Sequence, residues 1–137
     1  MQASEQQPSS EAQQYVNDMV AKRGYALRYH QILAASDYEV LKAANGLISA
    51  AYLGERLLPR ATKELIFIVS LIVLNAPKEH IQSHIRVAME IGVTPQEILE
   101  AIEISLPEAG VVAFQRGVEC WHEIVGGPVI EPTVGVG

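Results

Sequence analysis

The sequence predicts an all-α protein of about six helices. Apolar residues recur at three- and four-residue spacing along most of the chain, which is the period of an amphipathic helix. Proline and glycine stand between these segments, at positions that suit helix starts and ends. No other segment offers a strand partner to the run 65–74, which is rich in isoleucine and valine, so we expect that run to be helical as well.

Two helices are expected in the first part of the chain. The first covers 10–23 and is followed by a glycine that can end it. The second begins at a capping-box pattern, in which Ser36 is followed three residues later by Glu39, and it is expected to end at Gly54. His30 falls in the connection between them, where the sequence predicts no role for it.

The second part of the chain is predicted to contain four more helices. Their expected ranges are 59–74, 77–91, 95–105 and 107–125. The first of the four is apolar on nearly every side, so we expect it to be the most buried helix. The third begins at a second capping box, formed by Thr94 and Glu97. Pro107 suits the first turn of the last helix.

The chain length of 137 residues suits a single domain, which we expect over 10–125. Residues 1–9 carry no large apolar side chain beyond Met1 and are expected to form a disordered arm. Residues 126–137 mix glycine, proline and β-branched residues, a composition that excludes a helix and is too apolar for an ordinary solvated tail. We therefore expect an extended tail that packs along its own subunit or a neighbour.

Composition and charge exclude several classes of function. The 10 basic and 16 acidic residues give a formal net charge of −6, which argues against nucleic-acid and anionic-membrane partners. The single cysteine, Cys120, excludes an internal disulfide framework, and a buried inert thiol is expected there. The longest apolar run is about half the roughly 20 residues that a membrane span needs. With no secretory signal visible, we expect a cytoplasmic protein.

The histidines of the predicted helix 77–91 are the first candidates for chemistry. His84 falls in the middle of the apolar face of that helix, so it should face the interior or an enclosed cavity. His80 lies one turn earlier, at the edge of this face, and Arg86 points the other way. His84 is either a hydrogen-bonded core histidine or a general acid and base, because an imidazole can both take and give a proton near neutral pH.

Glu64 is the second candidate, because a carboxylate on a mostly buried helix is costly unless it is paired or functional. It could be a first-turn acid favoured by the helix dipole, or the partner of Arg60 or Lys63. The helices 59–74 and 77–91 are expected to pack antiparallel, which could bring Glu64 to His84.

Two mechanisms use such a geometry. In one, His84 and Glu64 perform general acid–base catalysis. In the other, His80, His84 and Glu64 bind a divalent metal as two histidines and a carboxylate. A pair of histidines four residues apart is a weak metal signal, so no metal is favoured.

Trp121 could line a pocket or, since it lies on an apolar stripe, pack in the core. His122 beside it suits a helix-end cation.

Within residues 60–110, four sequence elements occur in a recognisable order. They are Lys63-Glu64-Leu65-Ile66, His84-Ile85-Arg86, Gly92-Val93-Thr94-Pro95 and Glu97-Ile98-Leu99-Glu100. Together they resemble the carboxymuconolactone decarboxylase family, whose superfamily includes the alkyl hydroperoxidase D-type proteins. The first 55 residues match this family only in their helical pattern, and the tail does not match it.

The resemblance implies an alkyl hydroperoxidase D-like helical bundle that assembles into a homo-oligomer, commonly a trimer or hexamer, with sites near subunit contacts. The peroxidase branch carries a Cys-x-x-Cys pair where this chain has Pro77 and His80, so the chain is not expected to be a thiol peroxidase. Pro77, Glu79 and the run from His84 to Arg86 look like the decarboxylase branch. His80 belongs to neither motif.

The activity implied by the resemblance is that of a carbon–carbon lyase without a cofactor, which decarboxylates a small lactone or keto acid, as in the breakdown of aromatic compounds. In such a site His84 would protonate carbon, Glu64 would orient the imidazole, and His80 would stand beside them. Arg86 could hold a substrate carboxylate across a subunit contact, and Trp121 could line the pocket. The alternatives are an isomerase, the metal-dependent enzyme described above, and a ligand-binding member of the fold without catalysis.

Overall fold

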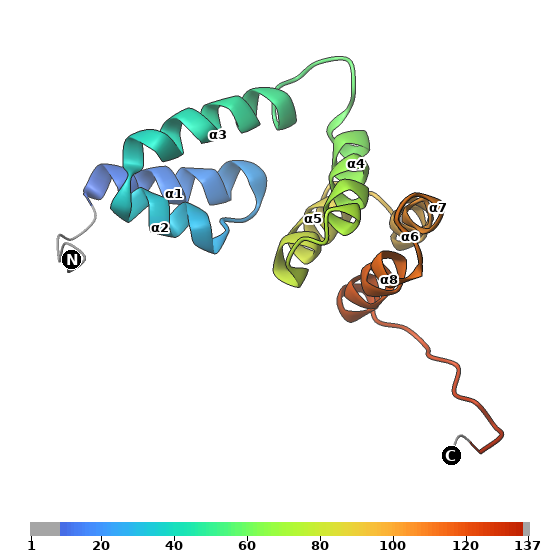
Figure 1. Ribbon diagram of the computed structural model, residues 1–137. Helices are drawn as coiled ribbons and strands as arrows, with labels where there is room; N and C mark the ends of the chain where they lie inside the picture. Colours follow the sequence, from blue (N-terminus) through green and yellow to red (C-terminus); the bar gives the residue numbers. More distant parts are fainter. Residues whose placement is uncertain (1–8, 136–137) are drawn as a thin grey trace. The chain divides into compact units, whose positions relative to one another are not determined.

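A computed structural model of the protein describes residues 9–135, and all regular secondary structure in that range is helical. The predicted all-α class is therefore confirmed. Eight helices replace the six expected in this range, and Figure 1 shows their course. They are α1 (Ser10–Arg23), α2 (Arg28–Ser36), α3 (Tyr38–Tyr52), α4 (Arg60–Val73), α5 (Lys78–Glu90), α6 (Pro95–Glu103), α7 (Ser105–Ala109) and α8 (Val111–Val125). Most of the arm predicted over 1–9 lies outside the described residues.

The chain divides into two compact units, and the division falls inside α4, between Glu64 and Leu65. We call them the N-terminal unit (residues up to 64) and the C-terminal unit (residues from 65). The prediction of one domain over 10–125 stays a prediction. None of the described helices combines the length and the apolarity that a membrane crossing requires.

The N-terminal unit is built on α1, α2 and α3, with α2 packed against both of the others (Figure 1). Its small core takes apolar residues from all three helices. The buried members are Ala12, Met19, Ala34 and Leu41. The rings of Tyr15 and Tyr38 meet edge to face at its border, with centroids 5.5 Å apart. Local sequence signals thus give helices, and apolar contacts between helices hold this unit together.

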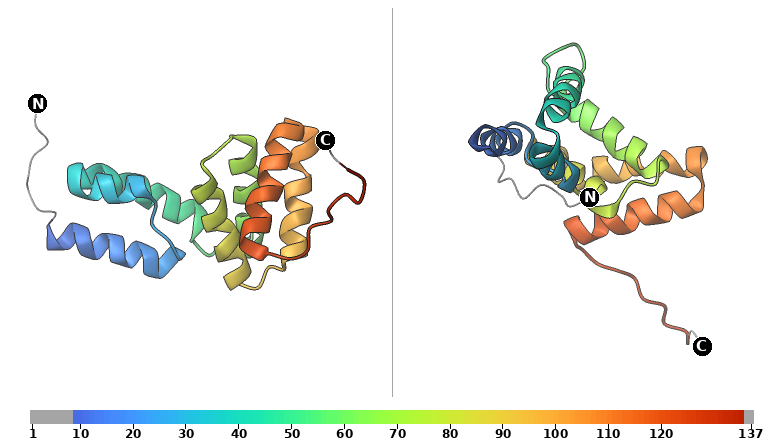
Figure 2. Two further views of the ribbon diagram at one scale, coloured as in Figure 1. Left: turned by 90° about the horizontal axis from the view of Figure 1, so that it is seen from below. Right: turned by 60° about the vertical axis from the view of Figure 1, so that its left-hand side comes forward.

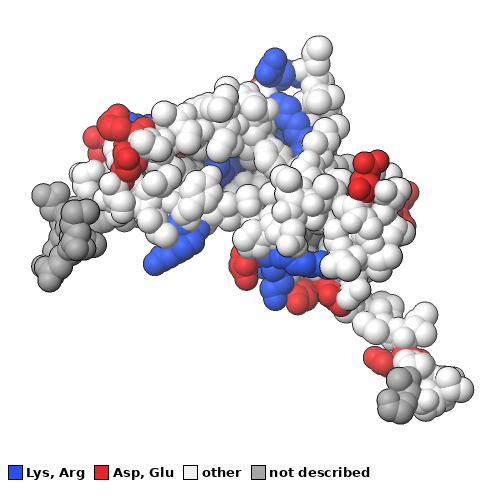
Figure 3. All heavy atoms as spheres, in the orientation of Figure 1, with Lys and Arg blue, Asp and Glu red and all other residues white. Residues whose placement is uncertain are grey.

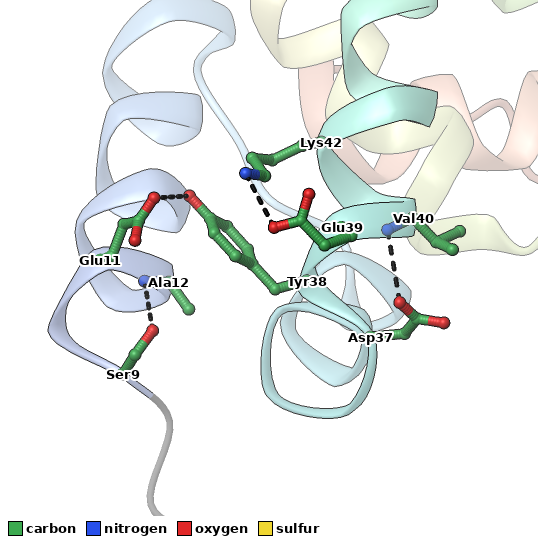
Figure 4. A network of polar contacts seen from close by, with 8 residues as sticks. All are labelled: Ser9, Glu11, Ala12, Asp37, Tyr38, Glu39, Val40 and Lys42. Carbon is green, nitrogen blue, oxygen red and sulfur yellow. Dashed lines mark hydrogen bonds and ion pairs between the residues drawn. The ribbon is translucent and has the colours of Figure 1, made fainter.

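Side-chain caps set the starts of α1 and α3, as Figure 4 shows. The Ser9 hydroxyl accepts a hydrogen bond from the Ala12 backbone at 3.1 Å, and the Asp37 carboxylate accepts one from Val40 at 3.4 Å. Ser36, predicted to cap the helix that follows it, is instead the last residue of α2. The prediction was wrong by one residue because Ser36 and Asp37 are both good capping residues and the chain uses the second.

Four polar side chains extend this network over α1 and α3. The Tyr38 hydroxyl donates to the Glu11 carboxylate at 3.4 Å, which joins the beginnings of the two helices (Figure 4). Lys42 and Glu39 form an ion pair at 3.0 Å, one turn apart on α3. Such exposed pairs contribute little to stability, so the apolar core dominates the packing of α1 against its neighbours.

The helix α2 was not predicted, and the expectation that His30 lies in a connection is wrong. His30 is a buried residue of the first turn of α2, and its Nδ1 accepts a hydrogen bond from the Leu27 backbone at 2.9 Å. The N-cap position is held by Leu27, which has no side-chain oxygen. The usual Ser, Thr, Asp or Asn signal is therefore absent, and a histidine from inside the helix supplies the cap instead.

In the C-terminal unit, α8 packs against α5, α6 and α7, and Figure 2 shows these helices from two further sides. Gly117 allows α8 to approach its neighbours closely. A Cβ atom at this position would lie 2.7 Å from Ile72 Cδ1 and 3.1 Å from Ile102 Cγ2. The capping box predicted at the start of α6 is confirmed, with hydrogen bonds of 3.0 and 3.1 Å between Thr94 and Glu97.

The last predicted helix, 107–125, is interrupted in the structure. A short α7 ends at Ala109, and Gly110 adopts φ 90° and ψ 176° before α8 begins at Val111. Residues other than glycine rarely adopt this backbone conformation, so Gly110 makes the break possible. The sequence indicated only the apolar spacing of α8, which does not reveal where the chain turns.

One expectation about burial is corrected. The helix α4, expected to be the most buried, exposes Ile66 and Val73 among the described residues, while α5 buries six of its 13 residues. The chain from Gly126 to residue 135 contains no helix, and its apolar side chains at Val129 and Ile130 are exposed. The packing of the tail along its own subunit or a neighbour stays a prediction.

Candidate functional site

His84 is fully buried in the C-terminal unit. It lies on the face of α5 that also carries Ile81, Ile85 and Ala88, all fully buried, as the helical spacing predicted. Its ring stacks on the ring of Phe67, with centroids 4.7 Å apart and only 6° between the ring planes. The imidazole is thus held in a fixed plane by an aromatic neighbour in apolar surroundings.

His80 lies one turn before His84 on α5 and is half-buried. The centroids of the two imidazole rings are 5.5 Å apart. Burial lowers the pKa of His80, and the nearby His84 lowers it further. Both effects favour a neutral His80 at neutral pH, when it can accept a proton. The pair therefore places one enclosed imidazole next to one that reaches solvent.

Metal binding by this region was one of the sequence hypotheses. Among residues 9–135, no group of three or more His, Cys, Asp or Glu side chains is arranged so that it could hold a metal ion. The hypothesis that His80, His84 and Glu64 bind a metal stays a prediction, and chelation tests it.

Glu64 is the last residue of the N-terminal unit and is fully buried. Of the two basic partners considered for it, the structure selects Arg60, whose Nε lies 3.6 Å from Glu64 Oε1 one helical turn away. Lys63 instead donates to two backbone carbonyls at the end of α3, at 2.8 and 3.3 Å. Glu64 is therefore one half of a partly enclosed ion pair.

Arg60 is fixed by three contacts in all. Besides Glu64, its Nη2 donates to the backbone carbonyl of Arg23 at 3.1 Å, and its guanidinium lies 5.4 Å from the centre of the Tyr52 ring. The contacts come from the end of α1, the end of α3 and α4 itself. The Arg60 side chain nevertheless keeps 32% of its area exposed, so part of it can reach a ligand.

Arg23 and Tyr25 complete the polar cluster of the N-terminal unit. Arg23 is buried, and its guanidinium donates to Asn45 and lies 5.9 Å from the centre of the Tyr25 ring. Burial raises the pKa of Tyr25 to about 12, and the negative charge of Glu64 adds to this, while Arg23 opposes it. Tyr25 is therefore protonated at neutral pH and can donate a hydrogen bond.

This cluster was missed at the sequence level. A basic residue in the last turn of a helix, such as Arg23, is usually an exposed cation that interacts favourably with the helix dipole. Its contact with Asn45 joins residues 22 positions apart, and the contact of its carbonyl with Arg60 joins residues 37 apart. No local pattern in the sequence indicates such contacts.

The two predicted substrate-binding residues, Arg86 and Trp121, differ in their surroundings. Arg86 is exposed, two residues after the buried His84 on α5. Trp121 is half-buried, and its indole nitrogen donates to the backbone carbonyl of Pro95 at 2.8 Å, which fastens α8 to the start of α6. Cys120 is buried, and burial raises the pKa of its thiol. The substrate-binding roles of Arg86 and Trp121 stay predictions.

A family model described as the carboxymuconolactone decarboxylase family matches residues 38–123. This range covers more than half of the chain and runs from the start of α3 into α8. It contains Glu64, His80 and His84 and begins after Arg23 and Tyr25. No curated protein and no solved structure matched the chain.

Proposed function

We propose, because the chain belongs to the carboxymuconolactone decarboxylase family, that it is a cofactor-free carbon–carbon lyase or isomerase acting on a small lactone or keto acid. The observation that carries the proposal is the burial of His84 against Phe67, on an otherwise apolar helix face. An imidazole held in one plane in apolar surroundings suits proton transfer to carbon, because water does not compete for the reactive carbanion.

In the lyase reaction, the bond between carbon and a carboxylate breaks, and carbon dioxide leaves. The electron pair of that bond passes into the neighbouring carbonyl of the lactone or keto group and forms an enolate. A protonated His84 then gives its proton to the carbon that lost the carboxylate, and it regains a proton from solvent for the next cycle. A hydrogen-bond donor at the enolate oxygen would lower the barrier further. In an isomerisation, a neutral His84 would first remove a proton from a carbon next to the carbonyl, and the imidazolium would return that proton at another carbon.

His80 fits this scheme as the imidazole beside His84. Because its pKa is lowered, it is mostly neutral near pH 7 and does not add a second positive charge next to a protonated His84. Its half-exposed position puts it in contact with solvent. We therefore assign His80 a supporting part in proton exchange within the proposed site.

Glu64 is retained as the carboxylate predicted to orient the imidazole of His84. Arg60 is one partner of Glu64, and the action of Glu64 on His84 stays a prediction carried by the family resemblance. A double-mutant cycle with Glu64→Gln and His84→Gln tests it. If the two residues act as one unit, the double variant loses little more activity than His84→Gln alone. Additive losses would contradict a joint role.

The main experiment screens small lactones and keto acids for carbon dioxide release by the full chain. Once a substrate is found, His84→Gln should lower kcat by about 100- to 10,000-fold, the usual contribution of a general acid or base. The far-ultraviolet circular dichroism should stay helical. His122→Gln is the matched control, since the His122 ring hydrogen-bonds with the Gly127 carbonyl near the end of α8. Normal turnover by His84→Gln would overturn the proposal.

The same assay separates the alternatives. A metal-dependent enzyme loses activity on chelation and regains it with one metal, whereas indifference to chelators contradicts that hypothesis. A ligand-binding member without catalysis binds the compounds but releases no carbon dioxide. The family resemblance also predicts a homo-oligomer, which light scattering measures, and the sequence predicts a cytoplasmic location, which cell fractionation measures. Exposed apolar residues on α4, such as Ile66 and Val73, support the oligomer.

A further inference from the structure

The connection between α3 and α4 forms a pocket that the proposed function does not use. Its cavity of about 270 Å³ lies entirely in the N-terminal unit, between the end of α3 at Tyr52 and the first turns of α4. We call it the α3–α4 pocket, and its polar lining consists of Glu55, Arg56, Arg60 and Lys63 together with Tyr52. A second cavity of about 320 Å³ adjoins it and shares Arg56 and Lys63.

We propose that the α3–α4 pocket binds a small apolar carboxylate, with its carboxylate at Arg56 and Arg60 and its apolar part against Leu57 and Leu58. The charge of the lining is the first argument. Three cationic side chains face one acidic side chain, Glu55, in a protein whose net charge is −6. Figure 3 shows basic side chains over this connection.

The second argument is that the cations are already held in place. The contacts of Arg60 to Glu64 and to the Arg23 carbonyl engage Nε and Nη2, and within the described chain they leave Nη1 for a ligand. Lys63 gives two of its three donors to the carbonyls that end α3, which leaves one. A guanidinium fixed before binding loses less conformational entropy when the ligand arrives, which favours binding.

The third argument is the apolar surface beside these charges. Leu57 is fully exposed and Leu58 is half exposed, although both are large apolar residues. Leu58 lines both cavities and Leu57 lines the adjoining one, next to Arg56. An apolar chain that covers these leucines removes apolar surface from water, while the cations satisfy the acid group. An inorganic anion would leave the leucines uncovered, so the pocket favours an organic acid with an apolar body.

Titration of the full chain with hexanoate and with the uncharged hexanamide tests the proposal by nuclear magnetic resonance at fixed ionic strength. Hexanoate should bind saturably with one site per chain, and hexanamide should bind at least about tenfold more weakly, because it lacks the charge. This proposal does not rest on catalysis by His84, so the titration also applies to His84→Gln. Equal affinity for the two probes would overturn it.

Variants locate the site. Arg56→Gln should weaken hexanoate binding about three- to fivefold, the usual range for a partly exposed ion pair. Leu57→Ser should weaken both probes. The matched control is Arg28→Gln, since Arg28 is an exposed arginine of the same unit that lies on α2 and donates to Gln31. Equal losses in Arg56→Gln and Arg28→Gln would mean general charge attraction and would overturn the assigned site.

Discussion

The N-terminal unit encloses an ion pair, Arg60 with Glu64, whereas the C-terminal unit encloses an imidazole, His84, against a phenyl ring. A carboxylate and a guanidinium stay charged at neutral pH, so their burial requires partners, and the N-terminal unit supplies them from three helices. An imidazole, in contrast, can take and give a proton near neutral pH. The comparison assigns a structural and binding role to the first cluster and proton transfer to the second.

Among the variants that test this comparison, we expect the largest change in stability from Glu64→Gln. The substitution keeps the shape of the side chain but leaves Arg60 without its counter-ion. We expect the free energy of unfolding to fall by about 3 kcal/mol, at the lower end for a broken buried pair because Arg60 reaches solvent. Urea denaturation measures this change.

The control for that prediction is Glu39→Gln, which removes the exposed ion pair with Lys42 in the same unit. There we expect a change of at most about 0.5 kcal/mol. If the free energy of unfolding falls by an equally small amount in both variants, the ion pair of Glu64 with Arg60 does not stabilise the fold. In that case the contrast between the two units would fail, and Glu64 would regain a purely catalytic interpretation.

A second prediction compares the packing of the two units through two helical glycines. Gly117 of α8 has Ile72 and Ile102 so close that an added side chain must displace them, whereas nothing lies within 4 Å of a Cβ added at Gly46 of α3. Gly117→Val should lower the free energy of unfolding by about 1–3 kcal/mol through overpacking. Gly46→Val should leave the free energy of unfolding unchanged or raise it by roughly a few tenths of a kcal/mol, since valine favours a helix more than glycine does. Thermal denaturation measures both, and equal effects would contradict the close packing of α8.

The parts of the fold that the sequence predicted well are those set by neighbouring residues. The limits of α1, the capping box of Thr94 and Glu97, and the burial of His84 all follow from spacings of three or four residues. Such signals act within one or two helical turns, so they do not depend on contacts with distant parts of the chain. The all-α class and the family resemblance rest on the same local patterns.

The parts that the sequence did not predict depend on contacts or conformations that no local spacing encodes. The helix α2 begins at Leu27, without a capping side chain, and the break before α8 depends on the backbone of Gly110. The cluster around Arg23 joins three helices, and its residues look like ordinary surface charges in the sequence. The candidate site was therefore predictable where it follows a helix face, at His84, and not where it is assembled from distant segments.

The smallest expected effect concerns pH and tests whether the imidazole pair differs from the ion pair as proposed. Burial lowers the pKa of His80 below its ordinary value of 6.5, with a further contribution from His84. The unfolded chain therefore binds the His80 proton more readily than the folded one. The stability contributed by a neutral His80 is complete above about pH 6.5 and is lost as pH falls from there through the folded pKa.

Nuclear magnetic resonance titration of the imidazole protons measures that pKa, and His80→Gln should flatten the dependence of the unfolding midpoint on pH below 6.5. Because the two rings are neighbours, the titration of His80 is repeated in His84→Gln. His122→Gln, in the same unit, should leave the dependence unchanged. A pKa of His80 at or above 6.5 would mean that the half-buried His80 ring carries a positive charge over more of the pH range than proposed. The C-terminal unit would then bury charge as the N-terminal unit does, and the argument for proton transfer at His84 would lose its physical basis.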